Sequence, residues 1–331
     1  MVAAVPRFLH VANGTATTAL IEAAAIPGAR SIWGDVLYEG PVPGGIGDAE
    51  LLDTRARFLA DEAEHPYPAV ADDLRAWRAV IDAHETYDEL VLWYEHDLFD
   101  QLNLLQLLSR LPRRVPANKR VSLICVGTFP GRPAFKGLGE LTPPELASLF
   151  DTRAPLGGSQ YALADRGWQT FRDSTPEAIE RLLQTDTTAL PFLARALRRF
   201  LEEYPWTTDG LSRTERRLLQ LSDAGPTPLI AIFPRMHDGE DAYYVTDGTL
   251  LGLAAELSDG AMPLLEMMPG RGDGPAGLDA RVTLTSRGRD VLGGRVDRVT
   301  ARGIDRWFGG VHVRPGNVWR WDRASERVIR A

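Results

Sequence analysis

The sequence predicts an α/β fold, with a parallel sheet in the N-terminal part and a smaller α+β domain at the C-terminal end. Three observations support this. Short apolar runs alternate with helical patterns over the first half of the chain, a proline-containing segment interrupts the pattern at 204–210, and helices then precede two strand-like runs. The alternation is typical of a Rossmann-like sheet, and the later order is typical of a winged-helix-like domain.

Four segments are predicted as strands because each is a short apolar run, largely of β-branched or aromatic residues. They are 7–12, 31–36, 90–94 and 121–126. Helical patterns lie between and after them, at 16–25, 49–63, 72–83 and 98–111. Strands and helices that alternate in this way form a parallel sheet with helices on both faces. The loops after the strands then gather at one edge, where ligands bind.

A helical extension follows the sheet. Thr142 and Glu145 have the spacing of a capping box, with Pro143 at the first helical position. Further helices are predicted at 159–171, 176–183 and 190–203. We therefore expect a Rossmann-like α/β domain over 1–140, its helical extension over 141–204, and a winged-helix-like domain over 206–331.

The predicted C-terminal domain opens with a second capping box, Ser212 with Glu215. The elements that follow are a short apolar element at 227–233, a helix at 249–257, strands at 263–268 and 280–285 joined by a glycine-rich loop at 269–277, and a helix at 286–294. The alternation of N-V-W-R-W-D at 317–322 predicts one strand of a hairpin, with its tryptophans in the core.

Composition excludes several classes of protein. Of 331 residues, 44% are hydrophobic and 25% are charged, which is ordinary for a globular protein. No apolar run approaches the ~20 residues of a membrane helix. Pro6 and Arg7 break the N-terminal run, so we expect no signal peptide and a cytoplasmic location. Cys125 is the one cysteine and lies in an apolar run, where cysteine usually acts as a small hydrophobic residue.

The stretch L-V-L-W-Y-E-H-D-L-F-D-Q at 90–101 carries the main functional prediction. Asp97 stands where a strand passes into a helix, so one interpretation is a simple N-terminal cap, worth ~1 kcal/mol. Capping does not explain Glu95 and His96, because adjacent strand residues point to opposite faces. We therefore expect a cap together with a site, with His96, Glu95 and Asp97 as candidate catalytic residues.

The ends of the other predicted strands also carry polar residues or glycines. Asn13-Gly14 is a tight-turn dipeptide directly before a helix, whose free N–H groups can hold a phosphate. A glycine-rich loop after the fourth strand permits close backbone approach and contains a lysine. Ordinary turns and a solvated lysine are the alternatives. The candidate ligand-binding residues are Asn13, Gly14, Thr15, Asp35, Glu39, Gln101, Lys136, Gly137 and Gly139.

Metal binding is a further alternative. The sequence contains no CxxC or HExxH motif, so a structural zinc site is not expected. Magnesium needs only one or two carboxylates in addition to phosphates, and the candidates are Asp35, Glu39, Glu95 and Asp97. The identity of any cofactor stays open.

Three motifs together resemble a known family. H-V-A-N-G at 10–14, W-x-D-V-L-x-E-G-P-V-P at 33–43 and L-W-Y-E-H-D-L-F-D-Q-L-N-L-L at 92–105 are similar to a bacterial domain family of unknown function, number eighteen thirty-five. R-W-F-G-G-V-H-V at 306–313 and W-R-W-D at 319–322 resemble the ending of its longer members. The resemblance implies a shared fold and site but no reaction. Thr15 departs from the aspartate that commonly follows N-G there.

Two main classes of function follow, and a small-molecule site for a phosphorylated or nucleotide-like ligand is the first. A metabolite-sensing DNA-binding regulator is the second, suggested by the predicted winged helix and by twelve arginines against five acids in 281–331. Its predicted recognition helix, at 246–260, has no arginine, lysine, asparagine or glutamine, so sequence-specific DNA binding is not expected. A scaffold that docks a protein partner, or self-association, is left open.

Overall fold

The computed structural model describes residues 6–62, 65–270 and 277–331. It divides into two compact units. The N-terminal unit comprises Met1–Leu197 and Trp307–His312, and the C-terminal unit comprises Arg198–Arg306 and Val313–Ala331. The division thus falls between Leu197 and Arg198, earlier than the predicted boundary at Pro205, and a short C-terminal segment belongs to the N-terminal unit.

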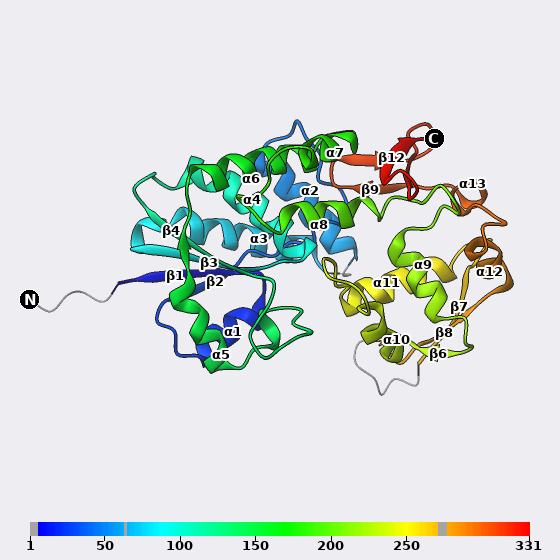
Figure 1. Cartoon of the computed structure of the whole chain (residues 1–331), viewed down its shortest axis with the longest axis horizontal. Coiled ribbons are helices and arrows are strands. Elements are labelled where there is room, and N and C mark those ends of the chain that lie inside the picture. The colour runs from blue at the N-terminus through cyan, green and yellow to red at the C-terminus, as the bar shows by residue number, and fades with distance from the viewer. Residues whose placement is uncertain (1–5, 63–64, 271–276) are drawn as a thin grey trace, which may run out of the picture. The chain divides into compact units, whose positions relative to one another are not determined.

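Within the described residues, five strands form the sheet of the N-terminal unit in the order β2-β1-β3-β4-β5 (Figure 1). The strands are β1 (Phe8–Ala12), β2 (Ala29–Ile32), β3 (Glu89–Glu95), β4 (Arg120–Val126) and β5 (Ala154–Pro155). The first four are parallel, and the short β5 runs antiparallel to β4. Every residue of β1 and β3 is buried, as expected for central strands covered on both faces.

The second strand is shorter and earlier than the predicted 31–36. β2 ends at Ile32, and Trp33 continues only one backbone hydrogen bond to Ala12. Beyond it the side chain of Asn103 takes the place of a neighbouring strand. Its Oδ1 accepts from the backbone N–H of Asp35 at 2.8 Å, and its Nδ2 donates to the carbonyl of Asp35 at 2.8 Å. A side-chain amide from a helix therefore satisfies backbone groups that the sequence pattern assigned to a strand.

Helices cover both faces of the sheet (Figure 1). One face carries α1 (Thr15–Ala23) and α5 (Pro143–Leu149), and the other carries α2 (Asp48–Glu62), α3 (Tyr67–Asp82), α4 (Leu98–Arg114) and α6 (Gly158–Phe171). α3 begins before the predicted 72, and α4 continues past Leu111 through Pro112. The end of the predicted helix at 49–63 lies outside the described residues.

The helix α4 is buried over nearly its whole length, which its polar residues did not indicate. It packs against α6, and Gly167 permits the close approach, because a Cβ there would lie 2.8 Å from Leu105 Cδ2. The buried polar residues of α4 consequently face other protein groups rather than solvent. The extension is completed by α7 (Glu177–Leu183) and α8 (Leu193–Leu201), and the predicted capping box at Thr142 is present.

The C-terminal unit contains the predicted order of helices, strands and helix. α9 (Arg213–Leu221), α10 (Leu229–Met236) and α11 (Asp247–Ser258) come first. Over the described residues, a small antiparallel sheet of order β6-β8-β7 accompanies them, made of β6 (Thr227–Pro228), β7 (Leu265–Met268) and β8 (Arg281–Leu284). α12 (Ser286–Leu292) and α13 (Arg298–Arg302) follow. The glycine-rich loop predicted between the two strands falls largely outside the described residues.

The last elements are short strands. β9 (Arg306–Phe308) pairs with β10 (Val311–Val313), and β11 (Trp319–Asp322) pairs with β12 (Arg327–Arg330). Trp319 and Trp321 are buried, as the alternating pattern predicted. Short 3₁₀ turns are present at η1 (His84–Thr86), η2 (Leu138–Glu140) and η3 (Phe150–Thr152). None of the helices in the described parts of the chain is long and apolar enough to span a membrane.

Candidate functional site

Three carboxyl groups meet at the carboxyl end of β3. Glu95 is the last residue of the strand, Asp97 is the N-cap of α4, and Asp100 lies in its first turn. The Asp97 carboxylate accepts from the backbone N–H of Asp100 at 2.9 Å, which confirms the predicted cap. Asp100 in turn accepts from the backbone N–H of Glu95. The strand end and the helix start are therefore joined through acidic side chains.

Asn13 from the end of β1 binds two of these carboxyls. Its Nδ2 donates to Glu95 Oε1 at 3.2 Å and to Asp100 Oδ2 at 3.1 Å. The hydroxyl of Thr17, in the first turn of α1, donates to Asn13 Oδ1 at 2.8 Å and so fixes which side of the amide faces the acids. We call Asn13, Glu95, Asp97 and Asp100 the carboxyl cluster.

The glycine-rich loop closes over Glu95. The backbone N–H of Leu138 donates to Glu95 Oε1 at 2.6 Å. A Cβ at Gly137 would lie 2.3 Å from Glu95 Oε2, although the backbone there is extended, with φ 179°. Gly137 is thus required because a larger residue would collide with Glu95. The predicted close approach of the loop backbone is therefore to the Glu95 side chain.

Gln101 and Cys125 hold the backbone of Glu95 in place. Gln101 Nε2 donates to the Glu95 carbonyl at 2.7 Å, and the Cys125 thiol donates to the same oxygen at 3.4 Å. Gln101, predicted as a ligand-binding residue, therefore contacts the carboxyl cluster through the main chain of Glu95. Cys125 lies beside the cluster with its thiol pKa raised by burial.

The carboxyl groups of the cluster are buried. Glu95 is 7% exposed, Asp97 9% and Asp100 0%, and their oxygens accept from the amide of Asn13 and from backbone N–H groups. Burial and the Asp97 charge raise the pKa of Glu95 to about 8, and burial raises that of Asp97 to about 6. Burial followed by the charge of Glu95 raises the pKa of Asp100 well above its usual value. The cluster consequently retains protons at neutral pH.

His96 lies between Glu95 and Asp97 in the chain, and its ring contacts an aromatic side chain. Its ring is 2% exposed and packs edge-on against Phe192, with 6.0 Å between ring centroids. A Cβ at Gly127 would lie 3.1 Å from His96 Cβ. The structure thus places His96 in a packed environment beside the cluster.

Asp35 and Glu39, the two acids predicted after the second strand, surround Arg55 instead of Asn13. Arg55 is 1% exposed and Asp35 is 6% exposed. The guanidinium donates to both Asp35 oxygens, at 2.9 and 2.8 Å, and to the Glu39 carbonyl at 2.6 Å. Asp35 is therefore the counter-ion of a buried arginine. Across the residues that the structure describes, no three His, Cys, Asp or Glu side chains are placed to hold a metal ion together.

The remaining predicted residues lie around the same edge without joining the carboxyl cluster. Gly14 precedes α1 and provides no side-chain cap, and Thr15 is exposed. Lys136 donates its backbone N–H to Glu140 at 3.1 Å. A Cβ at Gly139 would make only an ordinary contact, 3.8 Å from Ala16. Among these, the loop that carries Lys136 is the part that reaches the cluster, through its next two residues.

Two residues of the site were not among the predicted ones. Asp100 follows the capping Asp97 by three residues, which is the position whose N–H a cap binds, and Thr17 follows Asn13 by four. Both spacings are visible in the sequence. Only the burial of α4 shows that Asp100 faces Asn13 rather than water.

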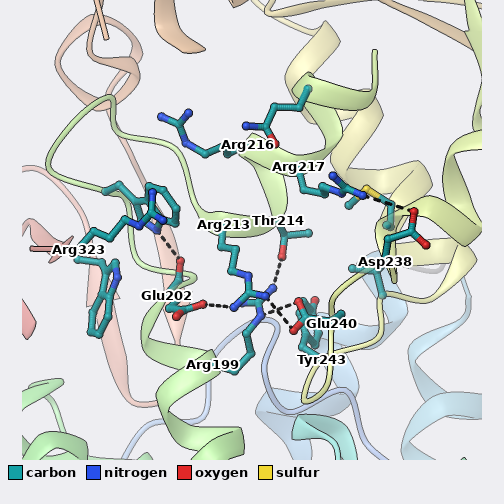
Figure 2. A pocket seen from close by; sticks show the side chains of 15 residues that line it. Arg199, Glu202, Arg213, Thr214, Arg216, Arg217, Asp238, Glu240, Tyr243 and Arg323 are labelled. Carbon is teal, nitrogen blue, oxygen red and sulfur yellow. Dashed lines mark hydrogen bonds and ion pairs between the residues drawn. The ribbon is translucent and has the colours of Figure 1, made fainter. Parts of the chain in front are cut away.

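The C-terminal unit has a cavity of about 350 Å³ with many arginines (Figure 2). Figure 2 shows Arg199 and Arg213 directed at Glu240, with 2.8 Å from Arg199 Nε to Glu240 Oε2. Arg213 also pairs with Glu202 at 2.6 Å. Further pairs join Arg216 to Asp209 and Arg217 to Asp238. Carboxylates of the unit itself thus neutralise most of the positive charge of this cavity.

The arginine-rich C-terminal stretch is likewise paired internally. Arg298 and Arg306 both bind Glu215 and Glu256, and Glu256 lies on α11. Arg320 binds Asp297 at 2.6 Å. These arginines hold elements of the unit together, so the net charge of the stretch overstates the charge available to a phosphate backbone.

Comparison with known proteins gives no match: no protein-family model matches the chain, and no curated protein does. The resemblance of the motifs at 10–14, 33–43 and 92–105 to domain family eighteen thirty-five stays a prediction.

Proposed function

We propose that the carboxyl edge of the N-terminal sheet is a small-molecule site in which the carboxyl cluster exchanges a proton with the ligand. The observation that carries the proposal is the burial of three carboxyl groups, those of Glu95, Asp97 and Asp100, around the amide of Asn13. Burying carboxyls in this way costs free energy, and a cap needs only one of them. Groups with raised pKa at the carboxyl edge of a parallel sheet are typical of functional sites.

Glu95 is the proton donor in this proposal. A pKa of about 8 keeps its carboxyl protonated at neutral pH, and the ionised form is then stabilised by the N–H of Leu138 and the amide of Asn13. Such a group can protonate a ligand and recover the proton afterwards. Asp97, with the lower pKa, stays largely ionised at neutral pH and keeps that of Glu95 high.

The proposed ligand is phosphorylated or nucleotide-like. The start of α1 supports this, because Gly14 offers no side-chain cap and no described group accepts from the first-turn N–H groups of Thr15 and Ala16. Free N–H groups at a helix start attract an anion. This helix start lies directly after Asn13, so a ligand there is within reach of the carboxyl cluster.

A thermal-shift screen of nucleotides and phosphorylated metabolites, with and without magnesium, tests the proposal. A ligand at a hundred times its Kd stabilises the folded protein by ~2.7 kcal/mol. We expect Glu95→Gln to bind the ligand more weakly than wild type and to lose any turnover. Glu85→Gln, at an exposed position, should change neither ligand binding nor turnover. The proposal fails if every stabilising ligand acts equally on wild type and Glu95→Gln.

His96 provides a second variant for the same screen. If His96 is the proton-transfer group instead, His96→Ala should fold normally and lose ligand binding or turnover. Its packing against Phe192 favours the opposite result, a loss of ~2 kcal/mol or more in stability with unchanged affinity.

The C-terminal unit is proposed to be winged-helix-like and to dock a protein partner rather than DNA. The order of α9–α11, the small sheet and α12 supports the likeness. The internal pairing of Arg298 and Arg306 supports protein docking. Specific operator binding that is lost on substitution in α11 would contradict it.

A further inference from the structure

A cavity of about 240 Å³ lies in the N-terminal unit, among residues of α2, α3, α4 and α6. It shares no residue with the carboxyl cluster. Its lining is rich in arginine and tryptophan and includes Trp33, Arg78, Gln106, Trp168, Gln169 and Arg172.

Arg78 is a half-buried cation without a counter-ion. Its Nη1 donates to the Leu74 carbonyl at 3.0 Å, and its guanidinium lies 5.6 Å from the centroid of the Trp33 ring. No carboxylate of the described residues is within ion-pair distance of it. Burial and the nearby charge of Arg110 lower the pKa of Arg78 to about 10. The charges of Asp35, Asp48 and Asp82 act on Arg78 in the opposite sense, but from beyond ion-pair distance, so its positive charge is only partly compensated.

Arg172 is a second cation of this kind in the same lining. It donates to two carbonyls, that of Pro43 at 2.7 Å and that of Ile46 at 2.9 Å, and its guanidinium lies 5.5 Å from the Trp168 ring centroid. Within the described part of the chain it also has no carboxylate partner. Carbonyl groups orient both guanidiniums, and no described carboxylate is hydrogen-bonded to either of them.

The other two arginines of the lining have carboxylate partners. Arg110 binds Asp48 at 3.0 Å and Asp82 at 3.3 Å, and Arg113 binds Asp165 at 3.2 Å. In the cavity of Figure 2, Arg199, Arg213, Arg216 and Arg217 each have such a partner. The cavity of Figure 2 has one lining arginine, Arg323, that forms no ion pair with a described carboxylate, whereas the cavity of the N-terminal unit has two.

We propose that this Arg78–Arg172 cavity binds a small multivalent phosphate, of the size of pyrophosphate or a short phosphorylated metabolite. Guanidinium groups match the geometry of phosphate oxygens and bind them in pairs. Gln106 accepts from Trp33 Nε1 at 2.9 Å through its Oε1, which leaves its Nε2 as a further donor. The volume is below the ~300–1,000 Å³ of sites for drug-sized ligands, which excludes a dinucleotide.

Isothermal titration of the full chain with sodium pyrophosphate, in phosphate-free buffer, tests this. We expect wild type to bind and Arg78→Met to bind at least tenfold more weakly. Arg75→Gln is the matched control, because Arg75 lies on the same helix, is exposed and pairs with Asp72. Absence of binding to wild type, equal binding by Arg78→Met, or an equal loss in Arg75→Gln would each overturn the proposal.

A second variant keeps the test decisive if Arg78→Met does not fold. Gln169 is exposed on α6 and donates to Asp165 at 2.8 Å, so Gln169→Glu adds a negative charge at the cavity with little effect on packing. We expect it to weaken pyrophosphate binding several-fold, and unchanged binding would count against the cavity.

Glu95→Gln separates this proposal from the one at the carboxyl edge. It should bind pyrophosphate like wild type, because Glu95 is not part of the lining. If Glu95→Gln loses pyrophosphate binding while Arg78→Met retains it, the anion binds at the carboxyl edge. The Arg78–Arg172 cavity is then refuted and the proposed function is not.

Discussion

Substituting Glu95 by glutamine should change how the stability of this protein depends on pH. The variant keeps an oxygen that can accept from Asn13 and from the N–H of Leu138, but it cannot ionise. The folded pKa of Glu95, about 8, lies above the ordinary 4.5. Between these values the folded chain holds a proton that the unfolded chain has lost. The free energy of unfolding of wild type therefore falls as the pH rises through this range.

The magnitude follows from the size of the shift. One pKa unit corresponds to ~1.36 kcal/mol, so the whole rise is worth at most about 5 kcal/mol. Asp97, with a pKa of about 6, completes most of its titration below pH 6.5. From pH 6.5 to 8.5, Glu95 alone should then cost wild type about 2 kcal/mol of stability. Glu95 is 7% exposed, so solvent screens this effect little.

Urea denaturation followed by circular dichroism at pH 6.5, 7.5 and 8.5 measures the difference. We expect wild type to lose about 2 kcal/mol more than Glu95→Gln over this range. Glu85→Gln, at an exposed site, should follow wild type. If the wild-type and Glu95→Gln profiles run parallel to within about 0.5 kcal/mol, Glu95 ionises normally in the fold and the reasoning from its burial is refuted.

Three further pairs of substitutions test individual contacts, each by its effect on the free energy of unfolding in urea. Asp97→Asn should be at least as stable as wild type, since asparagine caps equally well without a buried charge. Asp97→Ala should cost ~1 kcal/mol of stability. Equal stability of both variants would show that the cap contributes nothing. Gly137→Ala should cost ~1–3 kcal/mol because its Cβ would meet the Glu95 carboxyl, while Gly139→Ala should be nearly silent, and the reverse order would contradict the predicted clash. Asp35→Ala leaves the buried Arg55 unpaired and should cost ~3–5 kcal/mol of stability. Asp72→Ala, which removes an exposed ion pair, should cost ~0–1 kcal/mol. Similar losses in the two variants would mean that burial of the Asp35–Arg55 pair is unimportant.

The local pattern of the sequence determined the strand order along the chain, the helices between the strands, and the polar strand ends. Runs such as 90–94 and 121–126 are long enough, and apolar enough, to be strands in any buried parallel sheet. The cap at Asp97 and the box at Thr142 depend on neighbours within three residues, which is why they could be predicted.

Contacts between distant residues required the tertiary structure. Asn13 meets Glu95 and Asp100 only because β1 and β3 are adjacent in the sheet, and nothing in the sequence specifies that adjacency. Asp35 was predicted as a ligand-binding residue, and the structure shows its carboxylate paired with the buried Arg55 of α2, a residue twenty positions away. The end of β2 was misplaced for the same kind of reason, because the amide of Asn103 replaced a strand partner.

Burial was the property least accessible from the sequence. The polar residues of α4 have the pattern of a half-solvated helix, but Asp100 is fully buried in the structure, against Asn13 and the backbone of Glu95. Arg78 and Arg172 look like any other arginines in a chain that has 37 basic residues. The sequence determines which groups can carry charge. Whether a charge is solvated, paired or left uncompensated depends on the dielectric surroundings and the partners that the folded chain brings within a few ångströms, and these come from residues far apart along the chain.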